Sequence, residues 1–295
     1  MSIPFIKTLD FQYGVPAQIS PLIRRVIANN PGPFTFFGTG SYIIGHGNVA
    51  VIDPGPDDDV HLGALLAATK GEIITHIFVT HPHLDHSPLA AKLSAATGAK
   101  IYGKSEKLGH KPIDANTEEG DDDGFHPDIE VKDGEKIACH GFDLEAIFTP
   151  GHTGNHVCYA LPQENALFSG DHIMGWSTSV IIPPDGDMSD YLDSLDKVAA
   201  RDFATLYPTH GAPITEPAPF IAAYKQHRID RENQVIECLQ QGTTKITDMV
   251  PILYANVDKR LWPAAARSLH AHLIRLAKIG RATGGVNLND DFRLV

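Results

Sequence analysis

The stretch Thr80-His81-Pro82-His83-Leu84-Asp85-His86 directly follows an apolar run that is typical of a buried strand. Residues two apart in an extended chain point to the same side, so His81 and His83 can hold one metal ion together. Asp85 and His86 come where the chain turns into a helix, and they can face a second ion. Imidazole and carboxylate groups suit Zn²⁺, Fe or Mn²⁺. The pattern HxHxDH therefore predicts a metal centre at the end of this strand.

Three later segments place another potential ligand where a predicted strand ends. His152 lies in Thr149-Pro150-Gly151-His152-Thr153, Asp171 in Phe168-Ser169-Gly170-Asp171-His172, and His210 in Pro208-Thr209-His210-Gly211. A glycine beside each ligand allows the backbone to approach the site closely. Because these strands can share one sheet edge, the segments predict a single centre built with the first motif.

The spacing of apolar residues predicts a mixed α/β sandwich, with sheets inside and helices outside, over the first two hundred or so residues. Beyond that region the chain turns helical and ends in a Gly-rich turn and two strand-like runs, a pattern typical of a winged-helix module. We therefore predict a catalytic domain over residues 1–217 and a winged-helix-like domain over residues 218–295. The predicted strands are 42–44, 49–53, 73–80, 100–103, 142–149, 156–161, 166–169, 204–208, 286–288 and 292–294, and the helices are 60–70, 88–97, 188–200, 219–241, 246–254 and 264–279.

Charge is distributed unevenly along the chain, whose net charge is −12. Residues 1–217 contain 13 Lys and Arg against 29 Asp and Glu, whereas residues 218–295 contain 11 against 7. This asymmetry suggests two modules in different surroundings, although a solvated acidic surface beside a basic tail explains it equally well. The acidic run at 118–123 reads as a solvated loop rather than a cation site, because no periodic segment frames it.

Composition points to a protein of the cytoplasm. The N-terminal residues lack a basic start followed by a long apolar run, and no stretch approaches the roughly 18 apolar residues of a membrane helix. Cys139, Cys158 and Cys238 are far apart and odd in number, which favours reduced thiols over a disulfide framework.

The order and spacing of these motifs resemble the metallo-β-lactamase superfamily over residues 35–215. The resemblance implies an αββα sandwich that holds two divalent metal ions, with zinc as the first choice and manganese or iron as alternatives. It implies that Asp171 bridges the two ions and that Asp53, at a strand end, orients the site. It assigns the remaining ligands as His81, His83 and His152 to one metal, and Asp85, His86 and His210 to the other.

The residues after 217 carry a second resemblance. The string His227-Arg228-Ile229-Asp230-Arg231-Glu232-Asn233-Gln234 and the helices that follow look like the winged-helix tail of the β-lactamase-like protein 2 subgroup. Members of that subgroup have been linked to cleavage of single-stranded RNA. Asp171 at the bridging position is typical of thioesterase, phosphodiesterase and nuclease members rather than of antibiotic-cleaving ones.

The implied chemistry is hydrolysis by a metal-bridging hydroxide, since coordination lowers the pKa of water to about 7. Asp85 and Asp171 are the candidate catalytic residues, because their charge helps retain the ions and they can accept or relay a proton. His156 and His172 lie nearby in sequence. Each is interpreted first as a structural histidine and second as a donor that faces the substrate.

Three functions remain open at this point. The first is a phosphodiesterase acting on single-stranded RNA, and the second is a glyoxalase II-like thioesterase or esterase acting on a small molecule. The third is a non-catalytic winged-helix regulator with a structural metal site. The C-terminal module is as consistent with a homodimer contact as with RNA. Its candidate phosphate contacts are Arg228, Arg231, Lys259, Arg260, Arg267 and Arg275.

Overall fold

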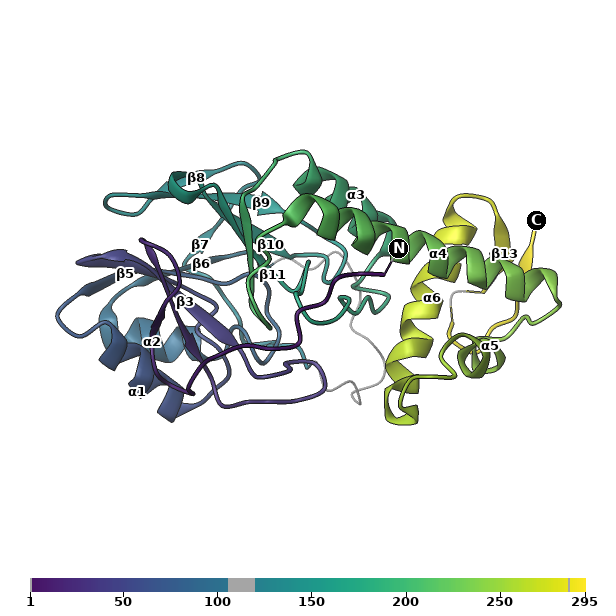
Figure 1. Cartoon of the computed structure of the whole chain (residues 1–295), viewed down its shortest axis with the longest axis horizontal. Helices are drawn as coiled ribbons and strands as arrows, with labels where there is room; N and C mark the ends of the chain where they lie inside the picture. The colour runs from purple at the N-terminus through teal and green to yellow at the C-terminus, as the bar shows by residue number, and fades with distance from the viewer. Residues whose placement is uncertain (1, 106–119, 286) are drawn as a thin grey trace.

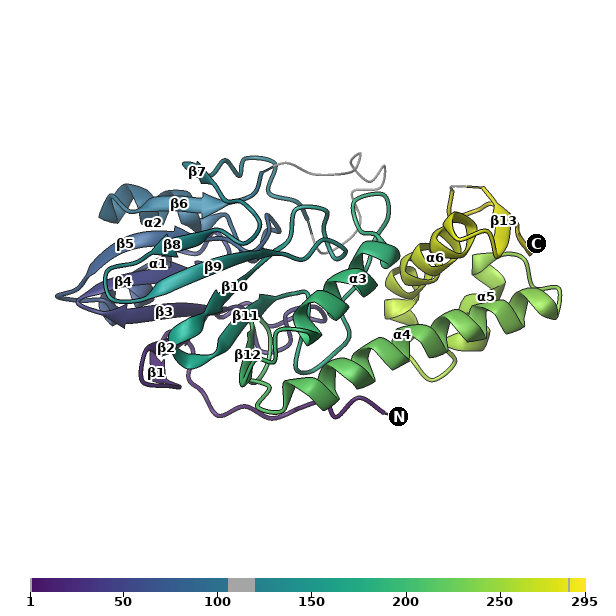
Figure 2. The same cartoon turned by 90° about the horizontal axis from the view of Figure 1, so that it is seen from above.

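The computed structural model describes residues 2–105, 120–285 and 287–295. Two sheets face each other with helices on their outer sides, which confirms the predicted sandwich (Figures 1 and 2). One sheet contains, in spatial order, β1 (Ala17–Gln18), β2 (Ile23–Ile27), β3 (Gly40–His46), β4 (Asn48–Ile52), β5 (Ile73–Phe78), β6 (Lys100–Gly103) and β7 (Ile129–Glu130). The other contains β12 (Thr205–Pro208), β11 (Ala166–Gly170), β10 (Val157–Leu161), β9 (Asp143–Phe148) and β8 (Lys136–Ala138).

Alternation of side chains along the strands divides the apolar residues among three layers. Tyr42 and Phe78 point inward and pack with Tyr159 and Phe168 of the facing sheet. Their strand neighbours, such as Ile43, point outward to the helices. The first sheet is covered by α1 (Asp59–Ala68) and α2 (Leu89–Thr97), and the second by α3 (Met188–Ala199) and α4 (Pro217–Gln240).

The C-terminal module consists of the end of α4, the helices α5 (Ile246–Leu253) and α6 (Trp262–Lys278), and a hairpin of β13 (Ala282–Gly284) and β14 (Phe292–Leu294). The long helix α4 runs from the sandwich into this module (Figure 2). Phe220 and Tyr224 pack in the core behind the second sheet, while Val235 and Leu239 pack in the core of the module. The predicted boundary at 217 thus falls at the start of a helix that both cores share, and it stays a prediction.

One predicted strand differs from the structure, and β2 was not predicted. The first strand of the hairpin is β13, where Ala282 pairs with Leu294, rather than residues 286–288. Residue 286 lies outside the described residues, and 287–288 are not in a strand. The sequence pattern also gave no sign of β2, because Arg24 and Arg25 interrupt its apolar residues. Arg25 is nevertheless buried and donates to the carbonyl of Gly211 at 2.9 Å.

Among the described residues, no helix is both long and apolar enough to span a bilayer.

Candidate metal centre

The seven predicted ligands meet at one edge of the two sheets, each on a segment that follows a strand. Six of them are buried, and the Asp85 side chain is 22% exposed. The motif after β5 supplies four, and the turns after β9, β11 and β12 supply His152, Asp171 and His210. The structure therefore brings together all of the residues that the sequence nominated.

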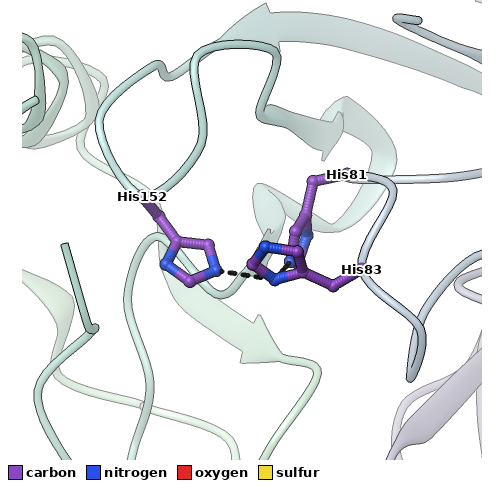
Figure 3. A group of neighbouring side chains, drawn as sticks. All are labelled: His81, His83 and His152. Carbon is purple, nitrogen blue, oxygen red and sulfur yellow. Dashed lines mark hydrogen bonds between the residues drawn. The ribbon is translucent and has the colours of Figure 1, made fainter. Parts of the chain in front are cut away.

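Three histidines form the first group (Figure 3). His81 Nε2 lies 2.9 Å from His83 Nδ1, and His152 Nε2 lies 3.3 Å from the same atom. The ring nitrogens of the three side chains thus converge on one point. His81 and His83 reach it from the same side of an extended segment, as their spacing predicted, while His152 comes from the facing sheet.

Asp85, His86 and His210 form the second group. The Oδ2 atom of Asp85 lies 3.0 Å from His210 Nε2 and 3.4 Å from His86 Nε2. Asp171 lies between the groups. Its Oδ1 atom is 3.6 Å from His86 Nε2 and 3.5 Å from His210 Nε2, and it also forms a cluster with His81 and His86. A carboxylate in this position can contact ions held at either side.

Hydrogen bonds fix the direction in which the histidines present their lone pairs. The Nδ1 atom of His152 lies 2.6 Å from the Val180 carbonyl oxygen, and that of His210 lies 3.2 Å from the Gly38 carbonyl oxygen. Because a carbonyl can only accept, Nδ1 carries the proton and Nε2 is left as an acceptor facing the centre. Partners of this kind normally orient metal-bound histidines.

Asp53 holds the third ring in the same way and ties the site to the fold. Its Oδ2 atom lies 2.9 Å from His86 Nδ1, and it also accepts hydrogen bonds from the hydroxyls of Thr80 and Thr209. The backbone of Asp53 has a φ of 47°, a left-handed conformation that aspartate tolerates better than most residues. The orienting role that the resemblance implied for Asp53 matches these contacts.

Two buried polar atoms at the centre, Nε2 of His86 and Oδ1 of Asp171, form no hydrogen bond within the described chain. They lie 3.6 Å from each other, which is too far for a hydrogen bond. A buried polar atom without a hydrogen bond is costly, and a charged one especially so. A cation between the groups would satisfy both atoms, so the donor set fits divalent metal ions.

The electrostatics of these ligands also favour metal ions. Burial, and the neighbouring histidines, hold the pKa of His81 and His83 well below the usual value, which keeps these rings neutral and able to coordinate. Burial also opposes the charged form of His86, but the carboxylates of Asp85 and Asp171 outweigh it and raise its pKa well above the usual value. The second group therefore attracts positive charge, in the form of protons or of metal ions.

The acidic run contributes a contact that the sequence did not reveal. The backbone of Gly120 accepts from Leu84 N–H at 2.9 Å, and Asp122 N–H donates to Pro82. Asp121 thereby places a carboxylate oxygen 3.8 Å from His83 Nε2, the nitrogen that faces away from the first group. Residues 120–123 lie in the predicted loop and are half-buried to exposed, but the contact of Asp121 with His83 was not predicted. Glu118 and Glu119 lie outside the described residues.

His156 is a structural residue of the centre. Its Nδ1 lies 2.9 Å from the Thr149 hydroxyl, and its Nε2 accepts from the backbone N–H of Asp171 at 3.2 Å. The ring thus positions the backbone of a candidate ligand. His172 is fully buried beside the ring of Tyr191, and burial lowers its pKa to about 3. These surroundings support the structural interpretation of both residues.

Comparison with known proteins agrees with this site. Residues 35–210 match the family model of the metallo-beta-lactamase superfamily, and residues 246–284 match that of the beta-lactamase associated winged helix domain. The chain is 31% identical to the beta-lactamase-like protein 2 homolog of Drosophila melanogaster, over 94% of this chain and 96% of the relative. It is also 31% identical to the atrochrysone carboxyl ACP thioesterase AgnL7 of Paecilomyces divaricatus, over 76% of this chain and 66% of the relative.

A solved structure shows that the fold extends over the whole chain. The beta-lactamase domain protein from Burkholderia ambifaria superposes with a TM-score of 0.79 at 18% identity, covering 100% of this chain and 97% of its own. At that identity the likeness concerns the fold alone. The family models and the full-length relative go further, and from them we conclude that the chain belongs to the metallo-β-lactamase superfamily of metal-dependent hydrolases, with its associated winged-helix domain.

Proposed function

We propose that the protein is a dinuclear metal-dependent hydrolase that cleaves thioesters or esters of small molecules. The observation that carries the dinuclear assignment is the position of Asp171 between two groups of ligands whose acceptor atoms face each other. His81, His83 and His152 would hold one ion, and Asp85, His86 and His210 the other. Zinc is the first choice, because its usual ligands are imidazole and carboxylate, and manganese and iron are the alternatives.

Bound divalent ions supply a nucleophile near neutral pH, because they lower the pKa of coordinated water to about 7. Hydrolysis forms a bond from water oxygen to the carbonyl carbon and breaks the bond from that carbon to sulfur or oxygen, and the departing sulfur or oxygen takes up the proton that the water loses. Asp85 is the catalytic residue best placed to accept the proton of the water, since its carboxylate is partly exposed beside the centre. Asp171 supplies charge at the junction of the two groups.

The basic residues of the C-terminal module favour a small substrate over a polyanion. Arg275 pairs with both carboxylate oxygens of Glu232 at 2.6 Å, and Arg260 pairs with Asp258 at 2.7 Å. Arg228 is 3% exposed. Lys259 and Arg231 lie over the rings of Trp262 and Tyr254. Arg260 and Arg275 are therefore paired with carboxylates and Arg228 is buried away from the surface, so these residues do not form an open basic track for RNA. Residues 1–217 also carry a strongly acidic balance that repels RNA.

The thioesterase named above supports the same reading, because it aligns with three quarters of this chain. The test is turnover of a panel of acyl thioesters and esters by protein loaded with Zn²⁺ or Mn²⁺. We expect hydrolysis of at least one thioester, lost in His81→Ala and Asp171→Ala and retained in His126→Ala, which removes an exposed histidine. Uniform inactivity of metal-loaded protein across the panel would overturn the substrate assignment.

Cleavage of single-stranded RNA is the second candidate, and the excess of Lys and Arg in residues 218–295 favours it. A labelled RNA in the same assay distinguishes the two substrates. RNA cleavage that requires His81 and Asp171, without thioester turnover, would establish this candidate in place of the first. A cytoplasmic location and a homodimer through the C-terminal module stay predictions.

A further inference from the structure

A pocket of about 220 Å³ lies between the sandwich and the C-terminal module. The sandwich contributes the segment from Met174 to Val180, α4 contributes Arg228 and Arg231, and the C-terminal module contributes apolar groups such as Tyr254. Helix α6 and the turn before it line the remaining side. The winged-helix module thus completes a cavity that the sandwich alone leaves open.

The pocket adjoins the candidate metal centre through its own wall. Val180 lines the pocket, and its carbonyl oxygen holds the ring of His152. Ser179, the preceding lining residue, donates from its hydroxyl to the backbone carbonyl of Asp171 at 2.6 Å. Trp176 lines the pocket and lies against Gly211, the residue after His210. One segment therefore lines the pocket and also contacts His152, Asp171 and the residue that follows His210.

Positive charge in the pocket has no counter-charge among the residues that the structure describes. No ion pair with a carboxylate is formed by Arg228 or Arg231 within the described residues, and no Asp or Glu among those residues lines the pocket. Arg228 is 3% exposed, and its guanidinium donates to the Ser179 carbonyl and lies over the Tyr191 ring. Burying a guanidinium without a counter-ion is costly.

The pocket residues also carry hydrogen-bond donors that have no acceptor among the described residues. The Nε atoms of Arg228 and Arg231 and the Nε1 atom of Trp176 are buried and lack an acceptor within the described chain. All three residues line the same pocket. The positive charge of the arginines also affects the neighbouring His227. Burial, together with the charges of Arg228 and Arg231, lowers the pKa of His227 to about 4. The cavity is thus apolar in most of its lining and supplied with unused donors at one side.

We propose that this pocket is a substrate subsite for an apolar group that carries an oxyanion, with Arg228, Arg231 and Trp176 as its donors. The proposal rests on the hydrolase function above and names the substrate class as anionic thioesters or esters. The oxyanion has two sources, a carboxylate at the end of the acyl chain or a phosphate on the thiol carrier. Guanidinium groups recognise both, because each accepts paired hydrogen bonds.

Turnover of matched substrates tests the subsite and separates the two sources. Adipoyl- and hexanoyl-N-acetylcysteamine differ in a terminal carboxylate, and hexanoyl-CoA adds the phosphates of the carrier to the same acyl group. We expect kcat/KM to be higher for one anionic substrate than for the neutral hexanoyl-N-acetylcysteamine. Arg231→Met should reduce the ratio of these two kcat/KM values about tenfold or more. Arg281→Met, which removes an exposed arginine of the same module, should preserve the ratio. Arg231→Lys should restore part of it.

Direct binding keeps the subsite and the catalytic proposal distinguishable. Calorimetric titration with adipate and with inorganic phosphate measures occupancy whether or not any thioester is hydrolysed. We expect one of them to bind the metal-loaded protein, with at least about tenfold weaker binding in Arg231→Met and unchanged binding in Arg281→Met. Absence of binding by both anions, or equal binding by the protein and its Arg231→Met variant, overturns the subsite. Anion binding without hydrolysis overturns the thioesterase assignment alone.

Discussion

His86 Nδ1 lies 2.9 Å from Oδ2 of Asp53, and both side chains are wholly buried. Asp53 is set at the end of β4 and accepts from the backbone N–H of Thr80 at 2.8 Å as well. The carboxylate thus connects the strand end before the HxHxDH motif to a ring inside it. Its position explains how a ligand in a loop acquires a fixed direction.

Asp53→Asn should weaken metal binding, because the amide no longer supplies a charged acceptor to His86. Removal of such a partner typically costs about 10- to 100-fold in metal affinity. Titration of Zn²⁺ against a competing chelator measures the change. Asp57→Asn is the matched control, since that side chain is 63% exposed and pairs with Lys92. Equal affinities for the protein and Asp53→Asn would show that Asp53 does not orient the site.

Gly151→Ala should destabilise the fold beside His152. Gly151 has a φ of +139°, and an added Cβ would lie 2.4 Å from the Cα of Tyr191. A conformation reserved for glycine and a backbone clash together cost about 2 kcal/mol or more. Gly63→Ala is the control. Gly63 lies in α1, and a Cβ added there would meet no neighbouring atom within 4 Å. Alanine at this position should raise the free energy of unfolding by up to about 1 kcal/mol. Similar urea midpoints for both variants would contradict this account.

Glu232 should make the C-terminal module sensitive to acid. Burial alone would raise its pKa, but the neighbouring His272, whose Nδ1 lies 3.8 Å away, and the hydrogen-bonded Arg275 hold the pKa below the ordinary 4.5. A carboxyl group whose pKa is lowered by folding stabilises the protein at pH values above its ordinary pKa. This stabilisation is lost as the pH falls through the pKa of the folded state. The unfolding free energy should therefore decrease below about pH 4.5 more steeply in the protein than in Glu232→Gln.

Urea denaturation at a series of pH values measures this difference. Glu237→Gln is the control on the same helix, because Glu237 is exposed. Its pH profile should follow that of the unchanged protein. Parallel profiles for the protein and Glu232→Gln would show that the Arg275 pair does not contribute to stability.

The ligands were predictable from sequence because their signals are local. The period of two along an extended chain places His81 and His83 together, and a turn after a strand places His152, Asp171 and His210 at sheet ends. The number of ions and the assignment of ligands to them came from the resemblance and remain proposals. The longer helices and most of the longer strands followed from apolar spacing, which is also a local property, whereas short strands and the arginine-interrupted β2 did not.

The remaining features depend on contacts between distant segments. Asp121 reaches His83 only because residues 120–122 bond to the backbone of the metal motif, and no periodic pattern marks that loop. In the sequence, Arg228 is indistinguishable from a charged residue on the exposed face of a helix, yet residues of the sandwich bury it. Trp176 lies in an irregular segment whose place beside α4 is set by tertiary packing. Pockets between modules therefore cannot be predicted from the sequence alone.

If Asp171 joins two metal sites, the number of metal ions bound per chain must depend on its carboxylate. Protein dialysed to equilibrium with Zn²⁺ would be analysed for zinc per chain, alongside Asp171→Ala and the control His126→Ala. We expect two ions in the protein and in the control, and fewer than two in Asp171→Ala because the carboxylate between His86 and His210 is gone. A single ion in the unchanged protein, or two ions retained by Asp171→Ala, would contradict the account.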